Sequence, residues 1–244
     1  MASYAILLAG GSGSRMRGAV SDKILAPLAG FPVLVHSLRA FLSAEVVHGF
    51  VIVCRDDAQQ SAIQEAVQPW ISPAFSLRWA RGGKERRDSV LNGLLACPDD
   101  AELVFIHDSA RPLLTTSALL ELSVVALRDG AAVLAHRVKD TIKQAPPHPR
   151  PVSPAVLQDL DRSTLWAMET PQVFRHHLIL DAYRQIISAG IPITDDVAAA
   201  IHAGHPVSLV ENLSPNPKIT EPHDLHWVEF LLQQNAAAES ASPP

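Results

Sequence analysis

The chain has 244 residues, 48% of them hydrophobic, and its 20 Lys and Arg residues against 25 Asp and Glu residues leave a net charge of −5. That length suits one α/β domain and leaves little room for a second. The acidic balance argues against a nucleic-acid partner, because such binding depends on neutralising phosphates. It still allows a local cationic cleft for a small phosphorylated ligand.

Neither a membrane segment nor a secretion signal is expected. No apolar run reaches the roughly 20 residues that cross a bilayer, and the first residues, MASYAILLAG, include no basic region or cleavage site. Cys54 and Cys97 stand in no metal-binding or redox spacing. We therefore predict a cytoplasmic protein with reduced thiols and no membrane partner.

Short apolar runs that end at turn residues predict strands buried on both faces of a sheet. Such runs lie at residues 4–9, 50–54, 103–107 and 131–135, with a weaker one at 75–79. Helical patterns alternate with them, one opened by Pro32 and others over about residues 57–67, 88–95 and 116–128. This alternation predicts an α/β fold with a mostly parallel sheet and helices on both faces.

The alternation stops after Arg137. Residues 144–154 read QAPPHPRPVSP, and five prolines exclude a helix or a central strand there. We expect an arm over about residues 137–163 that projects from a single domain of residues 1–234. The elements expected after the arm are helices over about 175–189 and 195–203, a strand at 206–210 and a final helix over 221–234. Residues 235–244, NAAAESASPP, are predicted to be a disordered tail.

A glycine-rich loop, GGSGSRM at residues 10–16, directly follows the first strand. Glycines at such a corner let backbone N–H groups hold an anion, at the sheet edge where ligands bind. The loop is not a Walker A motif, because no Gly-Lys-Ser/Thr follows, and Met16 occupies the position of the third glycine in a dinucleotide fingerprint. Arg15 and Lys23 favour a polyphosphate ligand over a plain turn, and Arg17 is expected at the surface.

Two further clusters follow strands in the same way, GGKERRDSV at residues 82–90 and HDSARP at residues 107–112. Asp108, at the end of a strand, is well placed to hold a divalent cation that bridges phosphates. Its alternative role is to cap the next turn. Arg111 is suited to a bidentate grip on a phosphate.

In this order, GGSGSRM, Lys23, GGKERRDSV, HDSARP, KDTIK, DRSTLW, ETPQ, TDD and NPKIT resemble the motifs of the 2-C-methyl-D-erythritol 4-phosphate cytidylyltransferase family of the non-mevalonate isoprenoid pathway. The resemblance runs from about Tyr4 to Leu225. It implies a Rossmann-like sheet with an arm that clasps a second subunit, and a homodimer with shared active sites. It also implies transfer of a cytidylyl group from CTP to a small alditol phosphate, with Mg²⁺ or another divalent cation and release of pyrophosphate.

The resemblance implies roles for individual residues as well. Arg15 and Lys23 would stabilise the reacting α-phosphate, and Lys218 would reach both substrates. The residues implied to contact CTP are Gly10, Gly11, Gly83 and Ser89. Asp108 would hold the metal. The residues implied to contact the alditol phosphate are Arg111, Thr141, Arg162, Thr170 and Thr194, of which Thr141 and Arg162 would serve the neighbouring subunit.

Some positions depart from the usual pattern of the family. Asp22-Lys23-Ile24 stands where the family has Pro-Lys-Gln, one residue further from the loop arginine. Glu169 replaces a glutamine, and Lys84 stands where an acidic residue is common. Other roles are open for several implied residues: Thr194, before two aspartates, suits a helix N-cap, Thr141 a strand end, Lys218 an exposed position and Arg162 an ion pair on the arm.

Two other functions remain open at this point. A ribitol-5-phosphate cytidylyltransferase would share the fold and the chemistry, although DRSTLW and its place on the arm favour the methylerythritol substrate. A non-catalytic nucleotide-binding regulator would share the fold but not the chemistry. The joint presence of Arg15, Lys23, Asp108 and Lys218 argues against a regulator.

Overall fold

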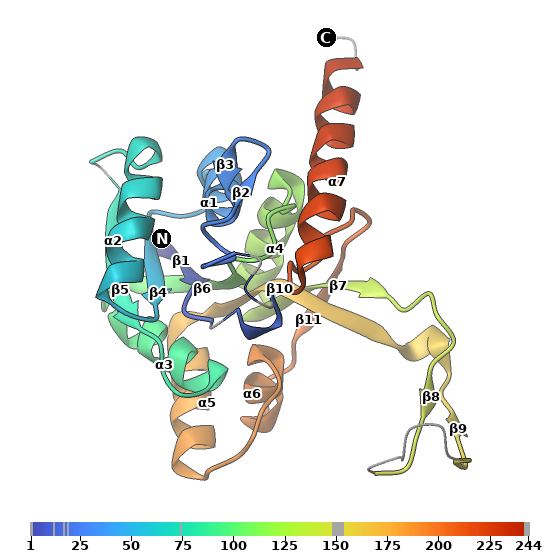
Figure 1. Ribbon diagram of the computed structural model, residues 1–244. Coiled ribbons are helices and arrows are strands. Elements are labelled where there is room, and N and C mark those ends of the chain that lie inside the picture. Colours follow the sequence, from blue (N-terminus) through green and yellow to red (C-terminus); the bar gives the residue numbers. More distant parts are fainter. Residues whose placement is uncertain are drawn as a thin grey trace.

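The computed structural model describes residues 2–11, 13–16, 18, 20–73, 75–147 and 154–241. Its centre is a seven-stranded sheet with the strand order β11-β7-β10-β6-β1-β4-β5 (Figure 1). The strands are β1 (Ala2–Leu8), β4 (Gly49–Cys54), β5 (Ser76–Arg81), β6 (Ala101–Asp108), β7 (Ala131–Arg137), β10 (Trp166–Arg175) and β11 (Ser208–Glu211). β10 runs antiparallel to β6 and β7, and the other neighbouring strands pair in parallel. The predicted mostly parallel sheet is confirmed.

Among the strands of the central sheet, β10 is the one that the sequence did not predict. No strand was expected between the arm and the helix predicted over about residues 175–189, yet Val173 pairs with Phe105 of β6 on one side and with Ala132 of β7 on the other. The polar residues Glu169, Thr170 and Gln172 break up its apolar pattern, although all three are buried. The pairing register with β7 shifts between Met168 and Gln172, where the chain passes through a cis peptide bond before Pro171.

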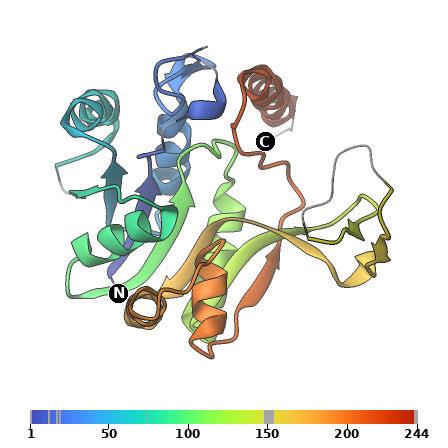
Figure 2. The same cartoon turned by 60° about the horizontal axis from the view of Figure 1, so that its bottom comes forward.

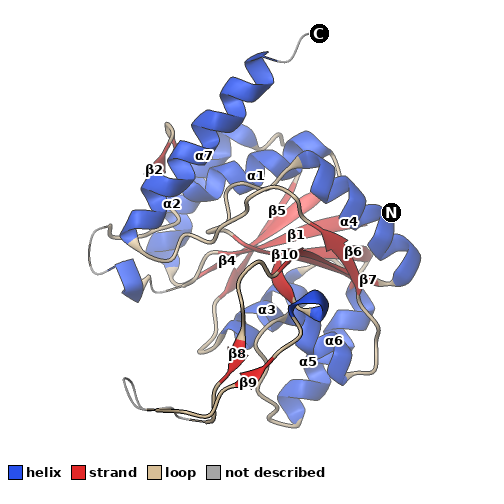
Figure 3. Ribbon diagram, turned by 90° about the vertical axis from the view of Figure 1, so that its right-hand side faces the viewer, coloured by secondary structure: helices blue, strands red, loops and turns tan. Residues whose placement is uncertain are grey.

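Helices cover both faces of the sheet, as predicted (Figure 3). The helices of one face are α1 (Val33–Ala44), α2 (Asp57–Val67), α4 (Thr116–Asp129) and α7 (Pro222–Ala241), and those of the other are α3 (Arg86–Ala96), α5 (His176–Ser188) and α6 (Asp196–His202). Side chains of a strand alternate between the faces, so Ala5 and Leu7 of β1 join one apolar cluster while Tyr4 and Ile6 join the other.

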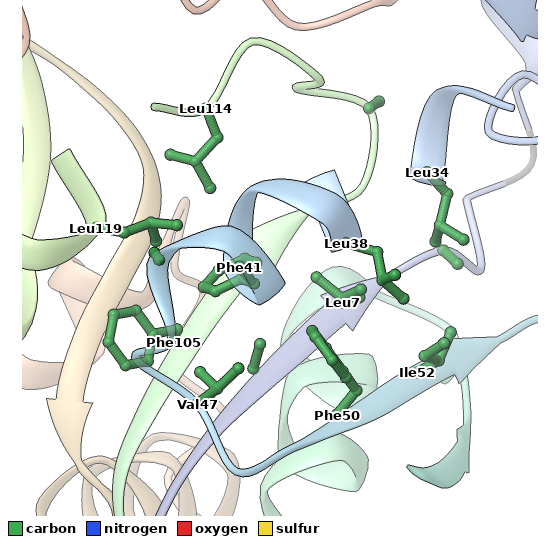
Figure 4. Close-up of a cluster of buried hydrophobic side chains, with 14 of the residues drawn as sticks. Leu7, Leu34, Leu38, Phe41, Val47, Phe50, Ile52, Phe105, Leu114 and Leu119 are labelled. Atoms are coloured by element: carbon green, nitrogen blue, oxygen red, sulfur yellow. The ribbon is translucent and has the colours of Figure 1, made fainter. Parts of the chain in front are cut away.

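The cluster beneath α1 centres on Phe41 (Figure 4). Its ring lies edge-on to Phe50 and Phe105, with ring centroids 6.3 and 5.7 Å away. All three rings are fully buried, and each such burial stabilises the fold by about 1.5–3 kcal/mol. This packing fixes α1 against the start of β4 and the interior of β6.

The chain between β7 and β10 projects from the domain (Figures 1 and 2). Its short strands β8 (Lys143–Gln144) and β9 (Gln158–Asp159) pair antiparallel. A 3-10 helix, η3 (Arg162–Thr164), then leads back to β10. Residues 148–153 of the proline-rich stretch lie outside the described part of the chain.

The remaining elements are small or terminal. After Lys23 the chain forms a hairpin of β2 (Pro27–Leu28) and β3 (Phe31–Pro32), and two 3-10 helices are η1 (Ser14–Met16) and η2 (Gln68–Trp70). α7 ends at Ala241, so the expected tail of residues 235–244 starts inside this helix. Arg17 and residues 242–244 lie outside the described residues. Within the described chain, no helix combines the length and apolar character needed to cross a bilayer.

Candidate active site

A cavity of about 530 Å³ opens at the carboxyl ends of β1, β4 and β6. Its walls come from the glycine loop, the turn that carries Lys23, the start of α3 and the segment between β11 and α7. The sequence-predicted residues that line it are Gly10, Gly11, Arg15, Lys23, Gly83, Ser89, Asp108 and Lys218. These residues are spread over most of the chain, and the parallel strands bring them to one edge.

The glycine loop leaves β1 against the end of β4. The N–H of Ala9 donates to the carbonyl of Val53 at 2.9 Å, which holds the two strand ends together. A Cβ atom at Gly10 would lie 3.3 Å from the backbone nitrogen of Arg55, so a side chain there would crowd the corner. Gly11 and Arg15 are exposed at the cavity mouth, where a ligand can reach the loop backbone.

Lys23 reaches across the cavity to the opposite wall. Its Nζ donates to the carbonyl of Ile219 at 3.0 Å. Burial lowers the pKa of Lys23 below its ordinary value, and the nearby Lys218 and Arg15 lower it further against the opposing effect of Asp108. A cluster of cations this close together is a favourable place for phosphate groups.

The second glycine cluster begins α3. The N–H of Gly83 donates to Ser89 Oγ at 3.0 Å, and this hydroxyl donates to the carbonyl of Glu85 at 3.1 Å. A Cβ atom at Gly83 would collide with the side chain of Asp88. The hydrogen bond from Gly83 to Ser89 therefore fixes this loop against the start of α3. Any larger residue at position 83 would displace the start of that helix.

Asp108 lies at the floor of the cavity between two cations. Its Oδ2 accepts from Lys218 Nζ at 2.6 Å, and its Oδ1 is 3.6 Å from Arg86 Nε. Burial alone would raise the pKa of Asp108, but the charges of Arg86 and Lys218 outweigh it and hold the pKa well below its ordinary value. Asp108 is therefore a carboxylate at neutral pH.

Arg86 and its partner Asp196 were not predicted as site residues. Nη1 and Nη2 of Arg86 donate to the two carboxylate oxygens of Asp196 at 2.7 and 2.8 Å, and Tyr183 donates its hydroxyl to the same carboxylate at 2.5 Å. Asp196 is fully buried, so this pair fixes Arg86 beside Asp108. The motifs GGKERRDSV and TDD contain both residues, but no spacing along the chain indicates that they meet.

Thr170 and Arg111 lie behind the cavity wall rather than in it. Thr170 Oγ1 accepts from the N–H of Asp108 at 3.1 Å and lies 3.1 Å from Nδ1 of His107. Arg111 Nη1 donates to the carbonyl of Asn216 at 2.6 Å, two residues before Lys218. Burial lowers the pKa of Arg111. In this arrangement both residues support the walls that carry Asp108 and Lys218.

Thr141, Arg162 and Thr194 do not join the cavity of their own subunit. Thr141 and Thr194 are exposed, and Arg162 donates to the carbonyl of Lys139 at 2.6 Å on the arm. The alternative role of Thr194 as an N-cap is wrong, because Asp195 caps α6 by accepting from the N–H of Ala198 at 2.9 Å. The carboxylate of the next residue occupies the position that a threonine hydroxyl would need.

A metal at this site would depend on Asp108. The part of the chain that the structure describes has no group of three or more His, Cys, Asp or Glu residues able to hold an ion. Mg²⁺ commonly binds through one or two carboxylates together with substrate phosphates. A single ionised carboxylate at the floor of a cationic cavity fits such a metal, because the remaining ligands would be phosphate oxygens and water.

Comparisons with known proteins agree over nearly the whole chain. The family model for 2-C-methyl-D-erythritol 4-phosphate cytidylyltransferase matches residues 3–234. A chloroplastic enzyme of that name from Oryza sativa subsp. japonica is 39% identical over 94% of this chain and 74% of its own. The Geobacillus thermodenitrificans enzyme of that name is 38% identical, over 96% of this chain and 98% of its own.

Solved structures share the fold. The 4-diphosphocytidyl-2C-methyl-D-erythritol synthase of Anaerococcus prevotii superposes with a TM-score of 0.82 at 24% identity, covering 95% of this chain and 96% of its own. The 2-C-methyl-D-erythritol 4-phosphate cytidylyltransferase of Thermus thermophilus does so with a TM-score of 0.74 at 25% identity, covering 96% and 100%. Together with the cationic cavity at the glycine loop, these matches identify a nucleotidyltransferase. More narrowly, the chain belongs to the 2-C-methyl-D-erythritol 4-phosphate cytidylyltransferase family.

Proposed function

We propose that this protein transfers the cytidylyl group of CTP to 2-C-methyl-D-erythritol 4-phosphate and releases pyrophosphate, in isoprenoid precursor synthesis. The observation that carries the proposal is that Arg15, Lys23, Asp108 and Lys218 line one cavity beside the glycine loop, where Lys218 contacts Asp108. Membership of the family supports the choice of nucleotide and of alditol phosphate.

In the proposed reaction, an oxygen of the substrate phosphate attacks the α-phosphorus of CTP. The new P–O bond forms as the bond to the β-phosphate oxygen breaks, and the electron pair leaves with pyrophosphate. A phosphate monoester is already anionic near neutral pH, so no strong base is needed. The obstacle is the approach of two anions, and positioning and electrostatic stabilisation therefore supply the catalysis.

The cations of the cavity are proposed to neutralise different phosphates. Arg15 and Lys23 neutralise charge on the α- and β-phosphates, and Lys218, which contacts Asp108, neutralises the incoming phosphate. Gly10, Gly11, Gly83 and Ser89 would bind CTP along the two glycine loops. Mg²⁺, held by Asp108 and phosphate oxygens, would supply charge neutralisation to the leaving pyrophosphate.

The arm is part of the proposal. Val156 and Leu157 on it are 91% and 55% exposed, and such apolar side chains favour burial against a two-fold partner. Thr141 and Arg162 would then reach the alditol phosphate in the cavity of the neighbouring subunit, where Arg111 and Thr170 support the wall that carries Asp108 and Lys218. A homodimer with shared active sites follows from this arrangement.

We also propose a cytoplasmic location. Cys54 and Cys97 are both free and buried, as expected of thiols in a reducing compartment.

A substrate panel tests the proposed function. CTP, UTP, ATP and GTP are each combined with methylerythritol 4-phosphate, ribitol 5-phosphate and sugar 1-phosphates, and pyrophosphate release is measured with Mg²⁺ and with a chelator. We expect release with CTP and methylerythritol 4-phosphate and loss with the chelator. Preference for ribitol 5-phosphate would reassign the substrate, and release with no pair would indicate a nucleotide-binding regulator.

A further inference from the structure

A buried glutamine lies where three walls of the cavity meet. Gln59, in the first turn of α2, is 2% exposed. Its Nε2 donates to the carbonyl of Ala9 at 3.1 Å and to Oδ2 of Asp22 at 2.6 Å, and its Oε1 accepts from the N–H of Arg55 at 2.7 Å. One amide thus joins the end of β1, the end of β4 and the turn before Lys23.

The carboxylate of Asp22, the residue before Lys23, also bonds the backbone of the residue after it. Its Oδ1 accepts from the N–H of Ile24 at 3.1 Å, while Oδ2 accepts from Gln59 and lies 3.4 Å from Nη2 of Arg55. The carboxylate therefore fixes the backbone before and after Lys23. Its side chain is 10% exposed, so water competes little with these bonds.

The partners joined in this way all face the ligand space. Ala9, Arg55 and Lys23 line the cavity, and Lys23 spans it to Ile219. A lysine side chain is long and flexible, and its free rotation would spread the ammonium over many positions. Fixing the backbone at its base narrows that spread. A displacement of about 1 Å at a reacting group can cost about 10²-fold in rate.

We propose that Asp22 and Gln59 are positioning residues that hold the turn of Lys23 against the ends of β1 and β4, so that its ammonium meets the phosphates. Neither residue contacts the reacting atoms. The inference rests on the proposed function through the role given to Lys23.

A double-mutant cycle tests this inference. Asp22→Ala is made in the wild type and in Lys23→Ala, and kcat and KM for CTP are measured with methylerythritol 4-phosphate. In the wild type we expect kcat to fall about 10-fold or more, with KM for CTP changed by less than about threefold. In the Lys23→Ala background the same substitution should change kcat by less than about threefold, because there is no ammonium left to position.

Controls separate positioning from folding. Glu65→Ala removes an exposed carboxylate from α2 and should leave kcat and the melting temperature unchanged. If Asp22→Ala does not fold, the isosteric Asp22→Asn takes its place, because the amide cannot offer Gln59 the same acceptor. Gln59→Leu should show the same dependence on Lys23.

Equal losses of kcat in both backgrounds would overturn the inference, as would no loss in the wild type or a Lys23→Ala enzyme that keeps its kcat. Failure of the proposed function has a different signature, which is a wild-type protein that releases pyrophosphate with none of the substrates in the panel.

Discussion

At the cavity, Asp108, Lys218 and Lys23 have polar partners within their own chain, whereas on the arm Val156 and Leu157 are 91% and 55% exposed. The cavity is organised by a rigid sheet edge, and its charges are placed before any ligand arrives. The arm has a short two-stranded ladder and little apolar packing of its own. One subunit by itself brings together the cavity proposed to bind the nucleotide, whereas the exposed apolar residues of the arm support our proposal that a second copy completes the alditol-phosphate half of the site.

The largest effect is expected in the cavity. Arg15→Ala and Lys23→Ala should each lower kcat by about 10²-fold or more, by analogy with the loss of one preorganised donor to a transition-state charge. CTP binding should weaken less than turnover. Steady-state kinetics with a CTP titration checks both. The matched control is Arg184→Ala, which removes an exposed arginine from α5 and should leave kcat unchanged. If kcat of Lys23→Ala stayed within about threefold of the wild-type value, the role given to Lys23 would belong to another residue.

Subunit mixing tests the arm. If Arg15 acts in its own subunit and Arg162 acts in the partner, Arg15→Ala and Arg162→Ala homodimers should each be nearly inactive. In a mixed dimer one site carries both substitutions and the other carries none. Random pairing makes about half of the dimers mixed, so recovery after dissociation and mixing should approach about a quarter of wild-type activity. No recovery, with subunit exchange demonstrated by differently tagged chains, would place Arg162 outside the partner's site.

The pH dependence of kcat/KM is expected to show the smallest effect. Lys23 must be protonated to carry its charge, and burial with neighbouring cations lowers its pKa below the ordinary 10.5. The free enzyme should therefore lose kcat/KM as pH rises, at a lower pH than an ordinary lysine would give. Lys23→Arg, whose guanidinium stays charged, should remove this loss from the same pH range. If kcat/KM of Lys23→Arg still fell over the same pH range, the loss would arise from the titration of a group other than Lys23.

Much of the fold was predictable because its strands are apolar runs between glycines and polar turns. β10 was missed for a physical reason: Glu169, Thr170 and Gln172 are polar, yet buried. Partners from distant segments satisfy them. Oε2 of Glu169 accepts from Asn212 and Asn216 at 2.9 Å each, and Gln172 accepts from the N–H of Asp196 at 3.0 Å. A pattern of hydrophobicity cannot indicate a strand whose polar groups are paired by tertiary contacts.

The candidate site was predictable where its residues follow strand ends. Arg15, Lys23, Asp108 and Lys218 stand beside glycine loops or in short motifs that predict phosphate chemistry. Gln59 gave no such signal, because a glutamine in the first turn of a helix is ordinary in sequence. Its importance comes from three partners, two of them 37 and 50 residues away along the chain.

The place of β10 also has a consequence for how the chain is synthesised. β10 lies between β6 and β7, so β7 has no strand beside it until residues 166–175 have left the ribosome with the arm already made. Until then β6 presents an open edge of unpaired N–H and carbonyl groups, the kind of edge that pairs with foreign strands. The nascent chain therefore presents the edge of β6 while the arm is emerging, until β10 pairs with it.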